Sequence, residues 1–167
     1  MFVAITLILS LLLDGILTNY LPFLVNDLSL FTPLFTLVSI FIIYPFYRKN
    51  EKKYFIIVII IGLLYDLFYT NLLFLNAILF FIIGLLTKYL YKNLETSHLK
   101  LLIYIPIIIA VYESLTAIVL FTFNIVPITF SKLGYKIVHS LILNIIYGEI
   151  IYFISNIVKR KKKISIN

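Results

Sequence analysis

Six apolar runs divide this sequence, and their lengths constrain the fold more than any other feature. They cover residues 2–20, 28–47, 54–70, 74–91, 100–123 and 134–158. Each is close to the ~20 residues that cross ~30 Å of hydrocarbon as an α-helix. Hydrophobic residues make up 63% of the 167 residues and charged residues 13%, which is more apolar surface than a soluble core of this size can enclose. We therefore predict an all-α integral membrane protein with six transmembrane helices in a compact bundle.

Lysine and arginine residues gather in alternate connections between these runs. All but two of the 14 basic residues lie after the second run, at the end of the fourth, or in the tail, and these are Arg48, Lys49, Lys52, Lys53, Lys88, Lys92, Lys100, Lys159, Arg160, Lys161, Lys162 and Lys163. The remaining two, Lys132 and Lys136, lie in the opposite connections. The positive-inside rule then places both termini in the cytoplasm. We divide the chain into a transmembrane domain, residues 1–158, and a basic cytoplasmic tail, residues 159–167, which we expect to lie against anionic lipid.

Small and polar residues recur at four- or eight-residue intervals within four of the runs. Such residues on one helix face allow membrane helices to approach closely and to form hydrogen bonds between them. We therefore expect these faces to pack together, with most large Leu, Ile and Phe side chains facing lipid. The candidate residues for helix packing or partner binding are Asp14, Gly62, Asp66, Thr70, Asn71, Asn76 and Gly84.

Four acidic residues lie inside apolar runs: Asp14, Asp66, Glu113 and Glu149. An acid at the centre of a membrane helix costs ~2.5–3.5 kcal/mol to insert, so it usually faces the bundle interior or water. Such a residue can have a function, as part of a ligand site, a proton path or a partner contact. It can instead have a structural role and form hydrogen bonds that join helices. For Asp66 we favour structure or partner contact, because few cations lie within the spans to pair with a substrate. The roles of Glu113 and Glu149 stay open.

Residues 11–21 repeat part of the pattern of residues 63–73. A shift of 52 positions aligns Asp14, Thr18 and Asn19 with Asp66, Thr70 and Asn71. The similarity is either an internal repeat or a chance match between two apolar segments.

Motifs for common enzyme chemistry are missing from the sequence. It has no cysteine, and it lacks Walker A, GxGxxG, HExxH and GxSxG motifs. We expect neither an enzyme nor a bound cofactor or metal. The formal net charge of +7 does not indicate nucleic-acid binding, because the cations lie between apolar spans rather than on one soluble face.

Two segments carry a resemblance to a known family. Residues 11–17, LLLDGIL, and residues 62–77, GLLYDLFYTNLLFLNA, together with the chain length and basic tail, resemble the rod shape-determining protein MreD family. The chain departs at Leu73 and Phe74, where the family often has a glycine near the turn. The resemblance implies a scaffold subunit of the cell-elongation complex in the bacterial cytoplasmic membrane. It implies binding to an MreC-like bitopic protein, with RodA, a class B penicillin-binding protein and MreB as indirect partners, and control of peptidoglycan synthesis and cell shape.

An alternative function follows from a similarity of fold. MreD proteins resemble the substrate-binding S components of energy-coupling-factor vitamin transporters, which also have six helices. An S component needs an external pocket that directs polar groups at the vitamin. The first outer connection offers only Asn19, Asn26 and Asp27 for this purpose.

Overall fold

The computed structural model describes residues 2–20, 32–70, 72–92, 98–125 and 130–164, and in this part of the chain all regular structure is helical. The prediction of an all-α protein with six α-helices is therefore confirmed for the described residues. The elements are α1 (Phe2–Tyr20), α3 (Phe35–Ile43), the 3₁₀-helix η1 (Tyr44–Tyr47), α4 (Glu51–Tyr69), α5 (Leu75–Lys92), α6 (His98–Thr122) and α7 (Phe130–Ile164).

Four of these helices are long and apolar enough to cross a membrane. The spans are Phe2–Asn19, Leu75–Lys92, Leu101–Thr122 and Leu133–Lys161. Helix α4 has 19 residues, but its first turn carries Glu51, Lys52 and Lys53, so it is not among the four. Helix α7 continues past the predicted end of its span at residue 158, and the basic tail is helical as far as Ile164.

The second apolar run differs from its prediction as one helix over 28–47. Residues 32–34 are not helical, and α3 spans only nine residues before η1 continues to Tyr47; residues 28–31 lie outside the described residues. Pro33 accounts for the non-helical conformation of Thr32, because the residue before a proline is disfavoured in the α conformation. All nine residues of α3 are buried. A helix that is apolar on every side fits the interior of a bundle.

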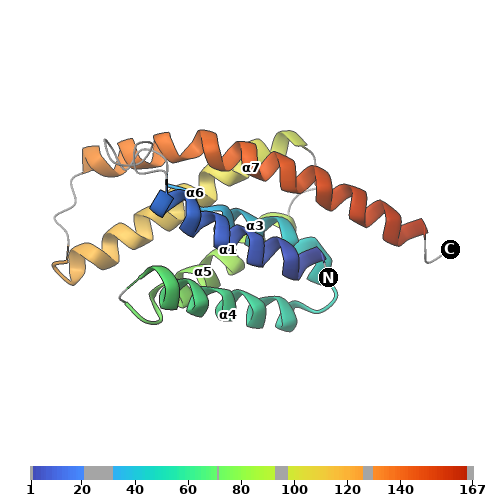
Figure 1. The fold of residues 1–167 in the computed structure, drawn as a ribbon, viewed down its shortest axis with the longest axis horizontal. Helices are drawn as coiled ribbons and strands as arrows, with labels where there is room; N and C mark the ends of the chain where they lie inside the picture. The colour runs from blue at the N-terminus through green and yellow to red at the C-terminus, as the bar shows by residue number, and fades with distance from the viewer. Residues whose placement is uncertain (1, 21–31, 71, 93–97, 126–129, 165–167) are drawn as a thin grey trace.

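The other helices surround α3. Helix α3 packs against α1, α7, α5 and α6, while α4 packs chiefly against α5, and α6 against α7. In Figure 1, α7 runs along one edge of the molecule and α4 along the opposite edge, with α3 between them. Helix α3 is thus a short central helix on which the longer helices α1, α5, α6 and α7 pack directly.

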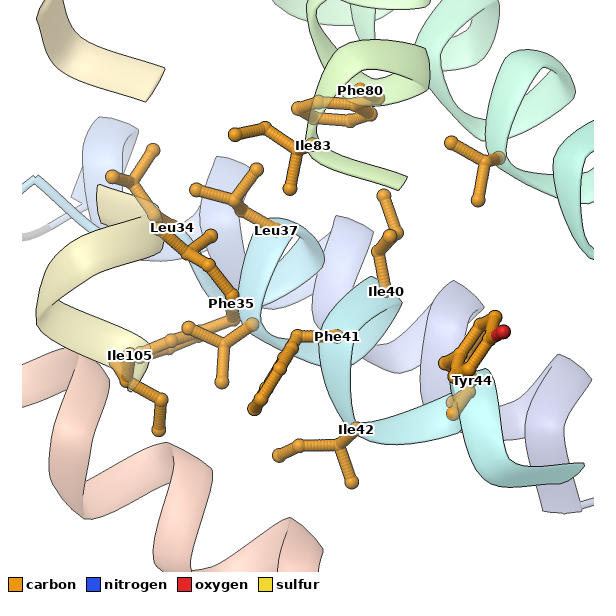
Figure 2. Packing of buried hydrophobic residues seen from close by; sticks show 14 of the residues in the cluster. Leu34, Phe35, Leu37, Ile40, Phe41, Ile42, Tyr44, Phe80, Ile83 and Ile105 are labelled. Atoms are coloured by element: carbon orange, nitrogen blue, oxygen red, sulfur yellow. The ribbon is translucent and has the colours of Figure 1, made fainter. Parts of the chain in front are cut away.

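The hydrophobic core is built around α3. Figure 2 shows Leu37 and Ile40 directed toward Phe80 and Ile83 of α5, while Phe41 and Ile42 lie on the opposite side of α3. The outward faces of the surrounding helices are also apolar, as a bilayer requires. Large exposed side chains on them include Ile8, Ile60, Ile78, Ile118 and Ile142.

Candidate functional site

The carboxylate of Asp66 lies at the first turn of α5. Its Oδ1 accepts hydrogen bonds from the backbone N–H of Asn76 at 2.9 Å and from the Asn76 Nδ2 at 2.8 Å, and its Oδ2 accepts from the Ala77 N–H at 3.2 Å. The Thr70 hydroxyl donates to Oδ1 at 3.0 Å. Asp66 is fully buried. The first N–H groups of a helix have no partner within that helix, and hydrocarbon offers none, so Asp66 supplies the acceptors that α5 needs.

A tight connection brings α5 to Asp66. Helix α4 ends at Tyr69, Thr70 is extended, and Phe74 has a positive φ of 70°, the region that favours glycine. This is one of the two positions where the sequence departs from the MreD pattern, so the chain makes the turn without a glycine there. Asn71, a predicted site residue, lies outside the described residues.

Gly62 allows the backbones of α4 and α5 to approach one turn before Asp66. A Cβ atom at position 62 would lie 2.5 Å from the Cα of Ala77 and 2.8 Å from its backbone nitrogen. The close approach keeps the Ala77 N–H within reach of the Asp66 carboxylate. Gly84 lies two turns further along α5 from Asn76. A Cβ atom at position 84 would lie 3.3 Å from a ring carbon of Phe55 and 3.4 Å from a ring carbon of Tyr54, which is an ordinary or slightly short contact.

Asp14 performs the same task for α3. Its Oδ1 accepts from the Phe35 N–H at 2.8 Å, and its Oδ2 accepts from the Thr36 N–H at 2.9 Å. The preceding N–H group, of Leu34, donates to Oδ1 of Asn144 in α7 at 2.8 Å. Asp14 and Asn144 are both buried. The N-terminus of α3 therefore lies inside the bundle with acceptors supplied by α1 and α7.

Asp14 and Asp66 accept hydrogen bonds from the start of a neighbouring helix in the same way. Each lies near the end of one helix and accepts from two consecutive N–H groups at the start of the next helix that packs on it, α1 with α3 and α4 with α5. Asp14 and Asp66 are the residues that the 52-position shift aligns. The shared geometry favours an internal repeat over a chance match.

Further hydrogen bonds join these two centres to α6 and α7. The Tyr112 hydroxyl donates to Oδ1 of Asn76 at 2.6 Å, and the hydroxyls of Ser39 and Tyr147 share a hydrogen bond of 2.8 Å. The Tyr54 hydroxyl of α4 donates to the Ile40 carbonyl of α3 at 3.2 Å, so the groups around Asp66 and Asp14 are linked and the hydrogen bonds connect all of the described α-helices.

Asn144 is the residue that sequence reasoning missed as a site residue. A signal was present, because Pro33 interrupts an apolar run and a helix that starts within such a run leaves N–H groups that require acceptors.

Glu113 and Lys136 form an ion pair between α6 and α7. The distance from the Lys136 Nζ to the Glu113 Oε2 is 2.7 Å, and Glu113 is buried while the Lys136 side chain is about one-third exposed. The second carboxylate oxygen, Oε1, has no hydrogen-bond partner among the described residues. Glu149 is half-buried on α7.

A family model for the rod shape-determining protein MreD matches residues 1–162 of the chain. The chain belongs to the MreD family. Membership supports a role in rod shape determination, and with the four long apolar helices it indicates a multi-pass membrane protein. No curated protein and no solved structure matches the chain, so the expected similarity to vitamin-binding S components is not confirmed.

The acids of this MreD-family chain are arranged for holding helices together. Both oxygens of Asp14 and of Asp66 already accept hydrogen bonds. Within the described ranges, no group of three or more His, Cys, Asp or Glu residues could hold a metal ion. MreD is a shape-determining family and is not known as a family of enzymes.

Replacing Lys136 with methionine is expected to destabilise the bundle by about 2 kcal/mol, because it leaves the buried Glu113 without its cation. This loss of stability is smaller than the ~3–5 kcal/mol for breaking a fully buried ion pair, because Lys136 is partly exposed. Thermal unfolding of detergent-solubilised protein measures the effect. Adding Glu113→Gln to Lys136→Met should recover part of the lost stability, and a double variant no more stable than Lys136→Met would contradict a paired role.

Proposed function

We propose that this MreD-family chain is a rigid scaffold subunit of the cell-elongation complex in the bacterial cytoplasmic membrane. It binds an MreC-like bitopic protein through its helix faces and thereby helps to control peptidoglycan synthesis and cell shape. RodA, a class B penicillin-binding protein and MreB are indirect partners in the same complex. Both termini lie in the cytoplasm, in agreement with the position of the basic residues.

The use of the buried acids carries the proposal. Asp14 and Asp66 bind the N-termini of α3 and α5, and neither carboxylate has an oxygen left without a hydrogen bond. A transport protein needs buried polar groups that are free to bind a solute, whereas a scaffold needs a bundle that keeps its shape. We expect the partner to contact the apolar outward faces of α1, α4, α5, α6 and α7.

Photo-crosslinking in living cells tests the proposal and also finds the face. A photoreactive residue is placed on one outward face at a time, at Ile8, Ile60, Ile78, Ile118 or Ile142, with the buried Val58 as the control. We expect a cross-link to a single MreC-like protein from one or two faces and none from Val58. The tagged chain should also bring down that protein from solubilised membranes.

Two results would contradict the proposal. One is the absence of an MreC-like protein both from every cross-linked face and from the purified tagged chain. The other is tight retention of a vitamin by the solubilised protein. A reporter fused after Lys163 that is active outside the cytoplasm would overturn the orientation.

A further inference from the structure

Helix α7 is longer than a membrane crossing. Its 35 residues span ~52 Å at 1.5 Å per residue, compared with ~30 Å for the hydrocarbon core. Lys136 and Lys159 lie 23 positions apart, about 34 Å, so they bracket the hydrocarbon. In Figure 1 the last turns of α7 project beyond the ends of the other helices. The residues from Lys159 to Ile164 therefore lie at the level of the lipid headgroups.

Lys159 is held against an aromatic surface. Its Nζ lies 5.2 Å from the centre of the Phe46 ring, and the Phe46 ring lies 5.4 Å from that of Phe2. These contacts join the end of α7 to η1 and to the first turn of α1. A lysine ammonium over an aromatic face forms a cation–π interaction, and its apolar stem remains in the hydrocarbon.

The positive charge of Lys159 has no counter-ion within the part of the chain that the structure describes. Among the described side chains, no carboxylate forms an ion pair with Lys159. Of the described acids, the one at this end of the bundle is Glu51, which pairs instead with Lys88 at 2.6 Å. The hydrogen bond from Lys88 holds the pKa of the Glu51 carboxyl below its usual value, so Glu51 stays ionised and committed to that pair. Lys159, with the exposed Arg160 and Lys161 next to it, is left to attract an anion from outside the chain.

We propose that the inner end of the bundle binds the headgroup of an anionic phospholipid between the last turns of α7 and η1. Lys159 and Arg160 hold the phosphate. One acyl chain lies along Phe46 beneath Lys159, and the other follows the exposed side chains of Phe153 and Ile157, which share the face of α7 with Arg160. Arginine and lysine both form charge-assisted hydrogen bonds with phosphate oxygens. The phenyl rings at the base of the site favour a lipid over an acidic soluble protein, which would contact Arg160 and Lys161 without needing an apolar base.

Thermal unfolding of the purified full-length protein in a neutral detergent tests this proposal. Phosphatidylglycerol, phosphatidylcholine or inorganic phosphate is added to separate samples, and lipid retention is measured in parallel by native mass spectrometry. We expect phosphatidylglycerol to raise the unfolding temperature and to remain bound, while phosphatidylcholine and inorganic phosphate do neither.

Three variants locate the site. Lys159→Gln and Arg160→Gln are expected to lose most of the shift caused by phosphatidylglycerol. Without lipid, Arg160→Gln should unfold like the wild type, whereas Lys159→Gln also loses its contact with Phe46, so its shift is measured from its own lipid-free unfolding temperature. The matched control is Lys92→Gln, which removes an exposed cation at the end of α5 and should keep the full shift.

Four outcomes would overturn the proposal. A full shift in Lys159→Gln would exclude this site, and an equal loss in Lys92→Gln would indicate attraction by the whole basic surface. A full shift with inorganic phosphate would assign the cations to a free anion. Purification of the chain with an acidic protein bound in place of lipid would indicate that Lys159 and Arg160 contact a protein.

Discussion

A chain with leucine at position 66 is expected to insert into the membrane normally, to unfold at a much lower temperature and to fail to maintain rod shape. Leucine favours transfer into lipid, so insertion should not suffer. The loss comes from three buried donors, the N–H groups of Asn76 and Ala77 and the Asn76 side chain, which lose their acceptor. Each buried donor without a partner costs ~1–3 kcal/mol.

This expected loss exceeds what a typical hydrogen bond between membrane helices contributes. Such bonds average ~0.6 kcal/mol, because side chains find other partners in the unfolded membrane state. At Asp66, by contrast, two of the donors are end groups of a helix that hydrocarbon cannot satisfy.

Membrane fractionation, thermal unfolding and cell morphology, with the variant as sole copy, measure the three effects of Asp66→Leu. Thr18→Leu is the control, because Thr18 is exposed and its hydroxyl bonds the carbonyl of Asp14 in its own helix. The unfolding temperature of Asp66→Asn should lie between those of the wild type and Asp66→Leu. The asparagine amide keeps one oxygen that can accept from one backbone N–H of α5, but it directs its own NH₂ donor toward the other. Wild-type unfolding and rod-shaped cells with Asp66→Leu would remove Asp66 from the site.

An alanine at position 62 is expected to destabilise the bundle. Overpacked interiors lose ~1–3 kcal/mol, and we expect a loss near the upper end of that range. The added Cβ would lie 2.5 Å from the Cα of Ala77, which is backbone and cannot rotate away. Helix α5 must then shift, and its first N–H groups move away from Asp66. We expect a lower unfolding temperature and reduced support of rod shape.

Gly134→Ala in α7 is the matched control for Gly62→Ala. A Cβ at position 134 would meet no atom within 4 Å. The same substitution should there leave stability unchanged or raise it slightly, because alanine favours a helix over glycine by ~1 kcal/mol. Equal behaviour of the two variants would show that the contact between α4 and α5 does not limit stability.

The lengths of the apolar runs predicted half of the described α-helices closely. Helices α1, α5 and α6 begin and end within two residues of their predicted bounds, because charged or turn-forming residues flank them. The central helix α3 could not be found in this way. Its run of 20 apolar residues satisfies the length of a crossing, although only Phe35–Ile43 is α-helical and all of it is buried.

The partners of the buried acids were beyond the reach of the sequence for a different reason. Spacing placed Asp14 and Asp66 on inward faces, and both are buried. Their partners, however, are backbone N–H groups at the starts of α3 and α5, and backbone groups leave no residue-type signal. Pro33 indicates a helix start that needs acceptors, but the sequence does not say which residue supplies them. The hydrogen bond from the Leu34 N–H to the Asn144 side chain joins positions 110 apart.

That separation has a consequence for biosynthesis. When the segment of α3 leaves the ribosome, the asparagine that completes its first turn has yet to be translated, and at ~5–20 residues per second it follows roughly 5–20 s later. During that interval the nascent segment holds a polar N–H group without its final acceptor in a medium that supplies none. Water near the translocon, or an insertase that shelters the segment, must bridge the delay until the last helix of the chain arrives.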